Sequence, residues 1–146
     1  MQRIDLEKWL LEVDAARTNE YYGEATDLCE CLDCKNYREA CEQLDPQVKQ
    51  LFHKLGIDPT KPDLLSEFGS IEDGLHLYMG HYYLVGKLIA GAYCSDVEWD
   101  PEHTATVGNF TFGFVAVEPS ENENLSQPGL WLEFEAKYPW LVKEDQ

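Results

Sequence analysis

The chain has 146 residues, of which 28 are acidic and 11 basic, so its formal net charge is −17. A surface of this charge repels nucleic-acid phosphates and anionic membranes, and it favours a basic partner or a cation. Hydrophobic residues make up 44% of the chain and aromatic residues 12%, which is enough to build a core. We therefore expect a single folded domain over residues 1–146 that binds no nucleic acid.

The first residues, 1–8, lack the apolar stretch of a secretory signal peptide. No window approaches the roughly 18 consecutive apolar residues that a membrane span needs. These two observations predict a cytoplasmic protein without a membrane partner. Its cysteines are then expected to be reduced, and the odd count of five also fits poorly with a disulfide framework.

The first half of the chain shows a helical period. Residues 3–17 predict an amphipathic helix, because apolar residues recur there at intervals of three and four. The same period returns from Lys35. Asp45-Pro46 is a typical N-cap and first-turn pair for a further helix, and Gly56 stands where a glycine would end it. Residues 57–62 contain two prolines and predict an extended linker.

After residue 62 the apolar period changes from 3.6 to 2. Alternation predicts strands over 64–68, 110–117 and 130–134. Gly113 within the second of these predicts a bulge or a close approach of another segment. Asp73-Gly74 is a turn signal, and residues 75–89 predict a hairpin that turns at Gly80-His81. This order predicts an α+β fold in which N-terminal helices are followed by an antiparallel sheet of about four to five strands.

The feature that suggests chemistry is Cys29-Glu30-Cys31-Leu32-Asp33-Cys34, three cysteines within six residues. Cys31 and Cys34 have the two-residue gap of one half of a structural zinc site, and Cys29 adds a third thiolate. Cys41 is too far along the next helix, because seven residues rise by about 10 Å, and we expect it to be a buried core thiol instead. The fourth ligand must come from a distant residue or from water, and the candidates are Cys94, His53, His76, His81 and His103.

Two other interpretations of this segment stay open. Cys31-x-x-Cys34 at a helix start is typical of redox thiols, yet the acidic neighbours Asp27, Glu30 and Asp33 disfavour a thiolate. The cysteines also suit a purely structural role, as small apolar side chains at a helix entrance.

Two function classes do not involve the cysteines. The net charge predicts an interaction or inhibitor protein, such as a toxin-neutralising immunity protein, that binds a basic partner. Alternatively, His76, Tyr78 and His81 line a pocket in which an imidazole serves a small enzyme or a ligand-binding module. No nucleophile, base and orienting residue can be assembled from the spacing, so we predict no catalytic residue and favour a protein that is not an enzyme.

Several motifs between residues 31 and 86, with Pro139-Trp140 near the end, resemble a known family. The residues are Cys31-x-x-Cys34-x-Asn36-Tyr37, then Leu55-Gly56-Ile57-Asp58-Pro59-x-Lys61-Pro62, Asp73-Gly74, Tyr78 and Val85-Gly86. Together they are similar to a family of small uncharacterised bacterial cytosolic proteins. The resemblance implies a bacterial origin and a shared fold, and it implies no catalytic residue.

Overall fold

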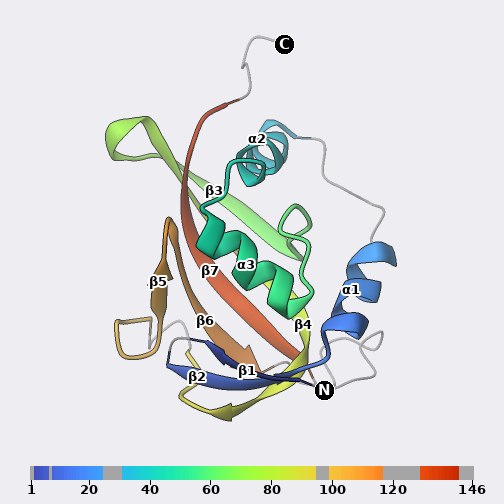
Figure 1. Cartoon of the computed structure of the whole chain (residues 1–146). Coiled ribbons are helices and arrows are strands. Elements are labelled where there is room, and N and C mark those ends of the chain that lie inside the picture. The colour runs from blue at the N-terminus through green and yellow to red at the C-terminus, as the bar shows by residue number, and fades with distance from the viewer. Residues whose placement is uncertain (1, 7, 25–30, 95–98, 117–128, 142–146) are drawn as a thin grey trace.

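The computed structural model describes residues 2–6, 8–24, 31–94, 99–116 and 129–141. Its strands form one seven-stranded sheet in which every pairing is antiparallel. Figure 1 shows helices α2 and α3 over one face of this sheet, with α1 beside them. In chain order the elements are β1 (Gln2–Leu6), β2 (Trp9–Val13), α1 (Ala15–Glu24), α2 (Leu32–Cys41), α3 (Pro46–Leu55), β3 (Leu64–Ser70), the 3-10 helix η1 (Glu72–Gly74), β4 (Leu75–Ala90), β5 (Ala105–Val107), β6 (Phe110–Ala116) and β7 (Gly129–Pro139).

The sheet is organised around β4, which is 16 residues long. The strand order is β1-β2-β4-β7-β6-β5, and β3 also pairs with β4. One edge of β4 pairs with β7 from Leu75 to Val85. The other edge pairs first with β3, through residues 76–81, and then with β2, through residues 86–90. A single strand therefore joins the N-terminal hairpin to the rest of the sheet.

The predicted order of N-terminal helices followed by four to five strands is wrong. The helix predicted over residues 3–17 does not form, because β1 and β2 pair as a hairpin in which Ile4 lies opposite Leu11 and only Ala15–Arg17 are helical, as the start of α1. Trp9, Leu11 and Val13 are buried and alternate with less buried residues, which is the period of a strand. The run is short and apolar, so it fits the helical period as well as the strand period. Pairing of β2 with residues 86–90 of β4, which β3 does not reach, favours the strand.

A helix does begin directly after the hairpin. The Asp14 side chain accepts a hydrogen bond from the Arg17 backbone N–H at 3.0 Å, which is the N-cap contact of α1. The Thr18 hydroxyl donates to the Asp14 carbonyl at 2.9 Å. The N-cap signal was present in the sequence, but the wrong period assigned to residues 3–17 concealed it.

The predicted hairpin turn at Gly80-His81 is also wrong, since β4 runs through both residues. A Cβ at Gly80 would lie 2.0 Å from the Leu64 carbonyl oxygen. The glycine therefore serves the close approach of the β3 backbone and not a change of direction. Gly86 has the same role towards β2, with a Cβ 2.4 Å from the Glu12 carbonyl oxygen.

Other sequence predictions are confirmed. Asp45 accepts a hydrogen bond from the Gln47 N–H at 2.9 Å as the N-cap of α3, and Pro46 opens the helix. Gly56 ends that helix with a φ of 78°, a conformation that favours glycine. Asp73-Gly74 lies in the η1 turn, and the strands expected at 64–68, 110–117 and 130–134 correspond to β3, β6 and β7, the last of which extends to Pro139.

The core lies between α2, α3 and one face of the sheet. Alternate residues of β4, β6 and β7 point to this face and are buried; they are Tyr78, Tyr82, Leu84, Phe110, Phe112, Phe114, Leu130, Leu132, Phe134, Ala136 and Tyr138. From the helices, Tyr37 packs edge-on against Tyr78 at 5.3 Å between ring centroids, and Phe52 against Tyr82 at 4.9 Å. We call this side of the sheet the inner face and the opposite side the outer face.

Side chains of α1 complete the edge of β4 between β3 and β2. The Tyr22 hydroxyl donates to the Tyr83 carbonyl at 2.6 Å and accepts from the Tyr83 N–H at 2.9 Å. Thr18 Oγ1 accepts from the Val85 N–H at 2.9 Å, and the Asp14 N–H donates to the Val85 carbonyl at the same distance. Because these backbone groups are buried, α1 supplies the partners that a strand would otherwise supply.

Candidate functional site

Two of the three predicted zinc ligands lie at the start of α2. Cys31 is its N-cap residue, with φ −69° and ψ 162°, and Cys34 lies in the first turn. Cys31 is exposed and Cys34 half-buried. Cys29 lies outside the described residues. Within the described ranges no group of three or more His, Cys, Asp or Glu side chains is placed to hold a metal ion, so the zinc site stays a prediction.

Cys41 behaves as the sequence predicted, as a core thiol. It is buried at the far end of α2 and donates to the Pro59 carbonyl at 3.4 Å. Burial raises the pKa of its thiol to about 12, and the charge of Asp58 acts in the same direction. The other residues considered as a fourth zinc ligand lie on separate elements: His53 on α3, His76 and His81 on β4, and Cys94 and His103 between β4 and β5.

The three residues of the predicted His/Tyr pocket do not come together. Tyr78 is fully buried on the inner face, where its hydroxyl accepts from Asn36 Nδ2 at 3.1 Å. The His76 ring packs against Trp140 at 4.8 Å between centroids, at the end of the same strand. His81 is an odd number of residues from both, so its side chain points to the outer face.

Asn36 and Tyr37, which belong to the resemblance motif, have structural contacts. Asn36 is fully buried, and its side-chain amide donates to the Pro139 carbonyl at 3.1 Å as well as to Tyr78. Its Oδ1 accepts from the Leu141 N–H at 2.5 Å. The Tyr37 hydroxyl lies 2.5 Å from that of Tyr82. This part of the motif therefore attaches α2 to the sheet and to the end of β7.

The outer face combines apolar and acidic side chains. Strand register places on it Leu64, Ser66 and Phe68 of β3, Met79, His81 and Tyr83 of β4, Val115 of β6, and Trp131, Glu133 and Glu135 of β7. Leu64 is 52% exposed and Phe68 61%, the highest values among the large apolar residues described. Large apolar side chains at such exposure beside carboxylates are typical of an interaction surface.

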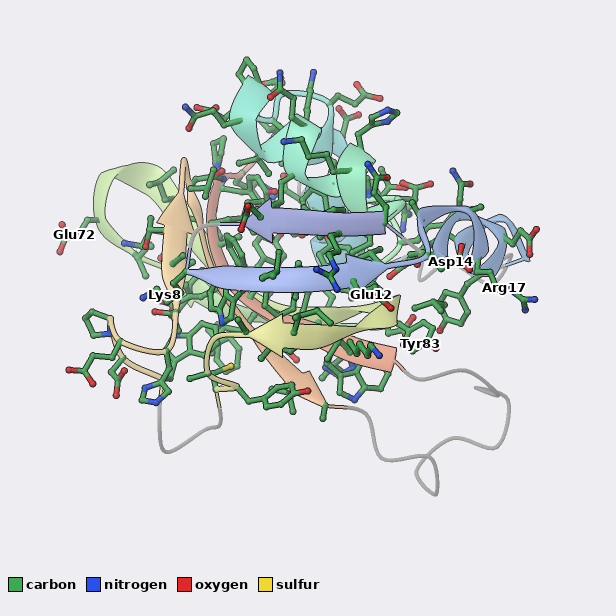
Figure 2. All side chains as sticks on the ribbon, turned by 60° about the horizontal axis from the view of Figure 1, so that its bottom comes forward. Lys8, Glu12, Asp14, Arg17, Glu72 and Tyr83 are labelled. Atoms are coloured by element: carbon green, nitrogen blue, oxygen red, sulfur yellow. The ribbon has the colours of Figure 1, made fainter. Side chains whose placement is uncertain are left out.

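An aromatic and acidic cluster borders this face next to α1. The Tyr21 hydroxyl donates to Asp63 at 2.8 Å, and the Tyr21 ring lies 4.8 Å from that of Tyr83, which Figure 2 labels beside α1. The His81 ring lies 4.1 Å from Trp131, and its Nδ1 is 3.6 Å from the Glu133 carboxylate. Burial raises the pKa of Asp63, while the Tyr21 hydrogen bond and the charge of His81 oppose the shift.

A pocket of about 460 Å³ opens beside this cluster. Its lining residues are Met79, Gly80, Cys94, Trp99, Val115, Glu133 and Phe134. The Trp99 indole N–H donates to Glu135 Oε2 at 3.2 Å, which holds the ring over the strand that carries Glu133. The volume lies within the range of small-ligand sites.

Two contacts position the described residues around this pocket, Cys94 and the segment that begins at Trp99. A Cβ at Gly113 would lie 2.6 Å from Cys94 Sγ, so the missing side chain lets Cys94 pack directly onto β6. The close approach predicted at Gly113 is thus confirmed. The Lys8 ammonium, labelled in Figure 2 at the β1–β2 turn, donates to the Pro101 carbonyl and attaches the segment to the hairpin.

Sequence reasoning named His81 and Cys94 of this surface, in other roles, and did not single out Trp131 or Glu133. Trp131 and Glu133 alternate with buried residues in β7, and that alternation marks an outward-facing row. The sequence could not show that the row lies between Met79 and Val115, because strand order depends on contacts far apart in the chain.

No protein-family model, no curated protein and no solved structure gives a significant match to this chain. None of the described helices is long and apolar enough to cross a membrane. The function is therefore argued from the geometry of the outer face.

Proposed function

We propose that this chain is a non-catalytic cytoplasmic protein that binds a basic protein partner on its outer face. The observation that carries the proposal is the exposure of Leu64 and Phe68 on the same sheet face as Glu133 and Glu135. Apolar side chains supply the buried area of a protein interface, and the surrounding carboxylates select a partner of opposite charge.

The charge of the whole chain supports the same partner. A net charge of −17 attracts a basic protein over distances longer than the contacts themselves and raises the rate of encounter. The attraction falls as salt screens it, whereas apolar contacts persist. A partner bound by both charge attraction and apolar contacts therefore loses part of its affinity as salt is added, but keeps the part that the apolar contacts supply.

Site-specific crosslinking tests the proposal. A photo-crosslinking residue replaces Phe68 in one variant and Leu32, 38% exposed on α2 over the inner face, in a control variant. We expect position 68 to capture a protein that position 32 does not. The captured protein is then identified and purified, and its affinity is measured at low and at high ionic strength.

Two results would contradict the proposal. One is capture at both positions with equal yield, which indicates no preference for the outer face. The other is a specific partner with an acidic isoelectric point or with an affinity that salt does not change. A Leu64→Ser and Phe68→Ser double variant should weaken binding of the purified partner by about tenfold or more, since each apolar contact contributes about 1–2 kcal/mol.

A structural zinc bound by Cys29, Cys31 and Cys34 is our second proposal, favoured by the position of Cys31 and Cys34 in one helical turn. Three thiolates suit zinc chemistry and need one further ligand or a water. Elemental analysis of protein purified without added metal tests it. We expect close to one zinc per chain in the wild type and in a Cys41→Ala control, and loss of zinc in Cys31→Ser. Less than about 0.1 zinc per wild-type chain would exclude the site.

A further inference from the structure

The outer-face pocket carries an inference that rests on the proposed function and makes it more specific. We infer that this pocket binds the side chain of an arginine from the basic partner. The lining residues provide the two surfaces that such a side chain needs, an apolar wall for its methylene groups and a carboxylate for its guanidinium.

The apolar wall comes from three strands and one loop. Met79 lies on β4 and Val115 on β6, with β7 between them. Trp99 closes the pocket from the segment before β5, and its indole N–H is already bonded to Glu135. Trp99 is half-buried, and an indole is a favourable stacking surface for a guanidinium.

The carboxylate is Glu133, whose side chain is 35% exposed at the rim of the pocket. The His81 ring nitrogen Nδ1 lies 3.6 Å from one of its carboxylate oxygens. A carboxylate has two oxygens and about four acceptor positions, so the His81 contact leaves capacity for a guanidinium. Glu133 is the one lining residue with a formal charge among those described, so the pocket favours a cation over a neutral or anionic group.

The pocket volume of about 460 Å³ accommodates a long side chain together with part of its neighbours. The exposed residues Leu64 and Ser66 lie across β4 from the pocket, opposite His81 and Met79 in register. An arginine in the pocket thus places the partner's backbone over Leu64 and Ser66, on the outer face proposed to bind the partner. This position makes the arginine an anchor at the centre of the interface.

A matched pair of peptides tests the inference. Both are short acetylated and amidated glycine-serine peptides, one with a central arginine and one with citrulline, its neutral isostere. Titration is followed by the NMR signal of the Trp99 indole N–H, which a Trp99→Phe variant assigns by its absence. We expect the arginine peptide to shift this signal in a saturable way and the citrulline peptide to leave it unchanged.

Two variants with the same change in charge locate the binding. Glu133→Gln should weaken binding of the arginine peptide by about tenfold, because it removes a hydrogen-bonded charge pair. Glu12→Gln, on β2 where the side chain lies 3.9 Å from Lys87, should leave the affinity unchanged. Unchanged signals of the other indoles show that each variant is folded.

Three outcomes overturn the inference: equal shifts with arginine and citrulline, equal affinity of Glu133→Gln and wild type, or binding of butylguanidinium without binding of the arginine peptide. The last outcome assigns the pocket to a free small cation. A partner captured at position 68 while the peptides fail would leave the docking proposal standing and reject only the arginine pocket. Peptide binding without a captured partner would leave the arginine pocket standing and reject the docking proposal.

Discussion

Asn36 shows how one buried amide can hold three parts of the molecule. Its side chain contacts the Tyr78 hydroxyl, the Pro139 carbonyl and the Leu141 N–H. Truncation removes one buried and two part-buried hydrogen bonds. Losing a buried partner costs more than a hydrogen bond contributes when both partners are solvated. The residue therefore explains, in structural terms, why an asparagine follows the cysteine pair.

We predict that Asn36→Ala lowers the free energy of unfolding by about 2–4 kcal/mol. Asn109→Ala is the control, since Asn109 makes one exposed hydrogen bond to the Lys137 carbonyl at 2.9 Å. Its expected cost is below about 1 kcal/mol. Urea denaturation monitored by circular dichroism measures both, and equal costs would show that the Asn36 contacts contribute little.

Cys41 predicts a loss of stability at alkaline pH. The folded-state pKa of its thiol, about 12, exceeds the ordinary value of 9.0. The folded state therefore keeps the proton to higher pH than the unfolded state, and stability present below pH 9 is lost as the pH rises towards 12. Burial also raises the pKa of Tyr37 and Tyr82 well above the ordinary value, with the same sign.

Thiol alkylation and thermal unfolding at several pH values check this prediction. Near neutral pH the thiolate population of Cys41 is about a thousandfold below that of an ordinary thiol, so it should resist iodoacetamide while exposed Cys31 reacts. Cys41→Ala should reduce the decrease in melting temperature above pH 9. Equal alkylation rates at the two cysteines would contradict the burial of Cys41.

Helix α1 contributes to the sheet through its side chains. Thr18 and Tyr22 provide the hydrogen-bond partners of Val85 and Tyr83 at the place where β3 has ended and β2 has not begun. This arrangement lets β4 bend away from β3 without leaving buried backbone groups unpaired. The helix is therefore part of the sheet's hydrogen-bonding scheme.

We predict that Thr18→Val, which preserves the side-chain shape, costs about 1–3 kcal/mol by leaving the Val85 N–H unpaired. Hydrogen exchange should become faster at the Val85 amide than at amides of the β4–β7 ladder. Arg17→Ala, on the exposed side of the same helix, is the control and should change neither quantity. Unchanged exchange at Val85 in Thr18→Val would show that another group pairs with this amide.

The glycines of β4 give a second prediction for an element. Gly80→Ala places a Cβ 2.0 Å from the Leu64 carbonyl oxygen, so β3 must move away, at a cost of about 3 kcal/mol or more. Gly23→Ala, in α1, meets nothing within 4 Å and should stabilise by about 0.5–1 kcal/mol. Thermal melts compare the two, and opposite signs are expected. A neutral effect of Gly80→Ala would contradict the pairing of β3 with β4.

At the scale of the whole molecule, the sequence predicted local features better than the arrangement of strands. The cap at Asp45 and the glycine at Gly56 follow from interactions between near neighbours, and both are confirmed. The hairpin of β1 and β2 was missed because its partner is the far end of β4, around Lys87. Residues distant in sequence decided the structure there.

For the candidate surface, the sequence predicted the acidic character and not the residues that meet there. Net acidity pointed to a basic partner, yet Trp99 and Glu133 meet only because the loop before β5 lies over β7. The predicted grouping of His76, Tyr78 and His81 assumed a hairpin turn, and the continuous strand separates them onto two faces.

The charge of −17 gives a prediction for the whole chain. Repulsion among surface carboxylates destabilises the compact state, and salt screens it. Moderate sodium chloride should therefore raise the melting temperature by about 2–4 °C, the shift that about 1 kcal/mol produces in a domain of this size. Differential scanning calorimetry measures it, and a melting temperature that falls with salt would indicate that attractive ion pairs dominate.

The pairing of β2 with the end of β4 has a consequence for biosynthesis. Leu10 pairs with Ala90, so the N-terminal hairpin leaves the ribosome long before its partner strand exists. Until then Trp9, Leu11 and Val13 have no core to enter, and a nascent chain exposes them to chaperones. Sheets closed by such distant contacts fold on the order of milliseconds to seconds, so the β1–β2 hairpin is synthesised before β4 and is among the last elements to reach its place.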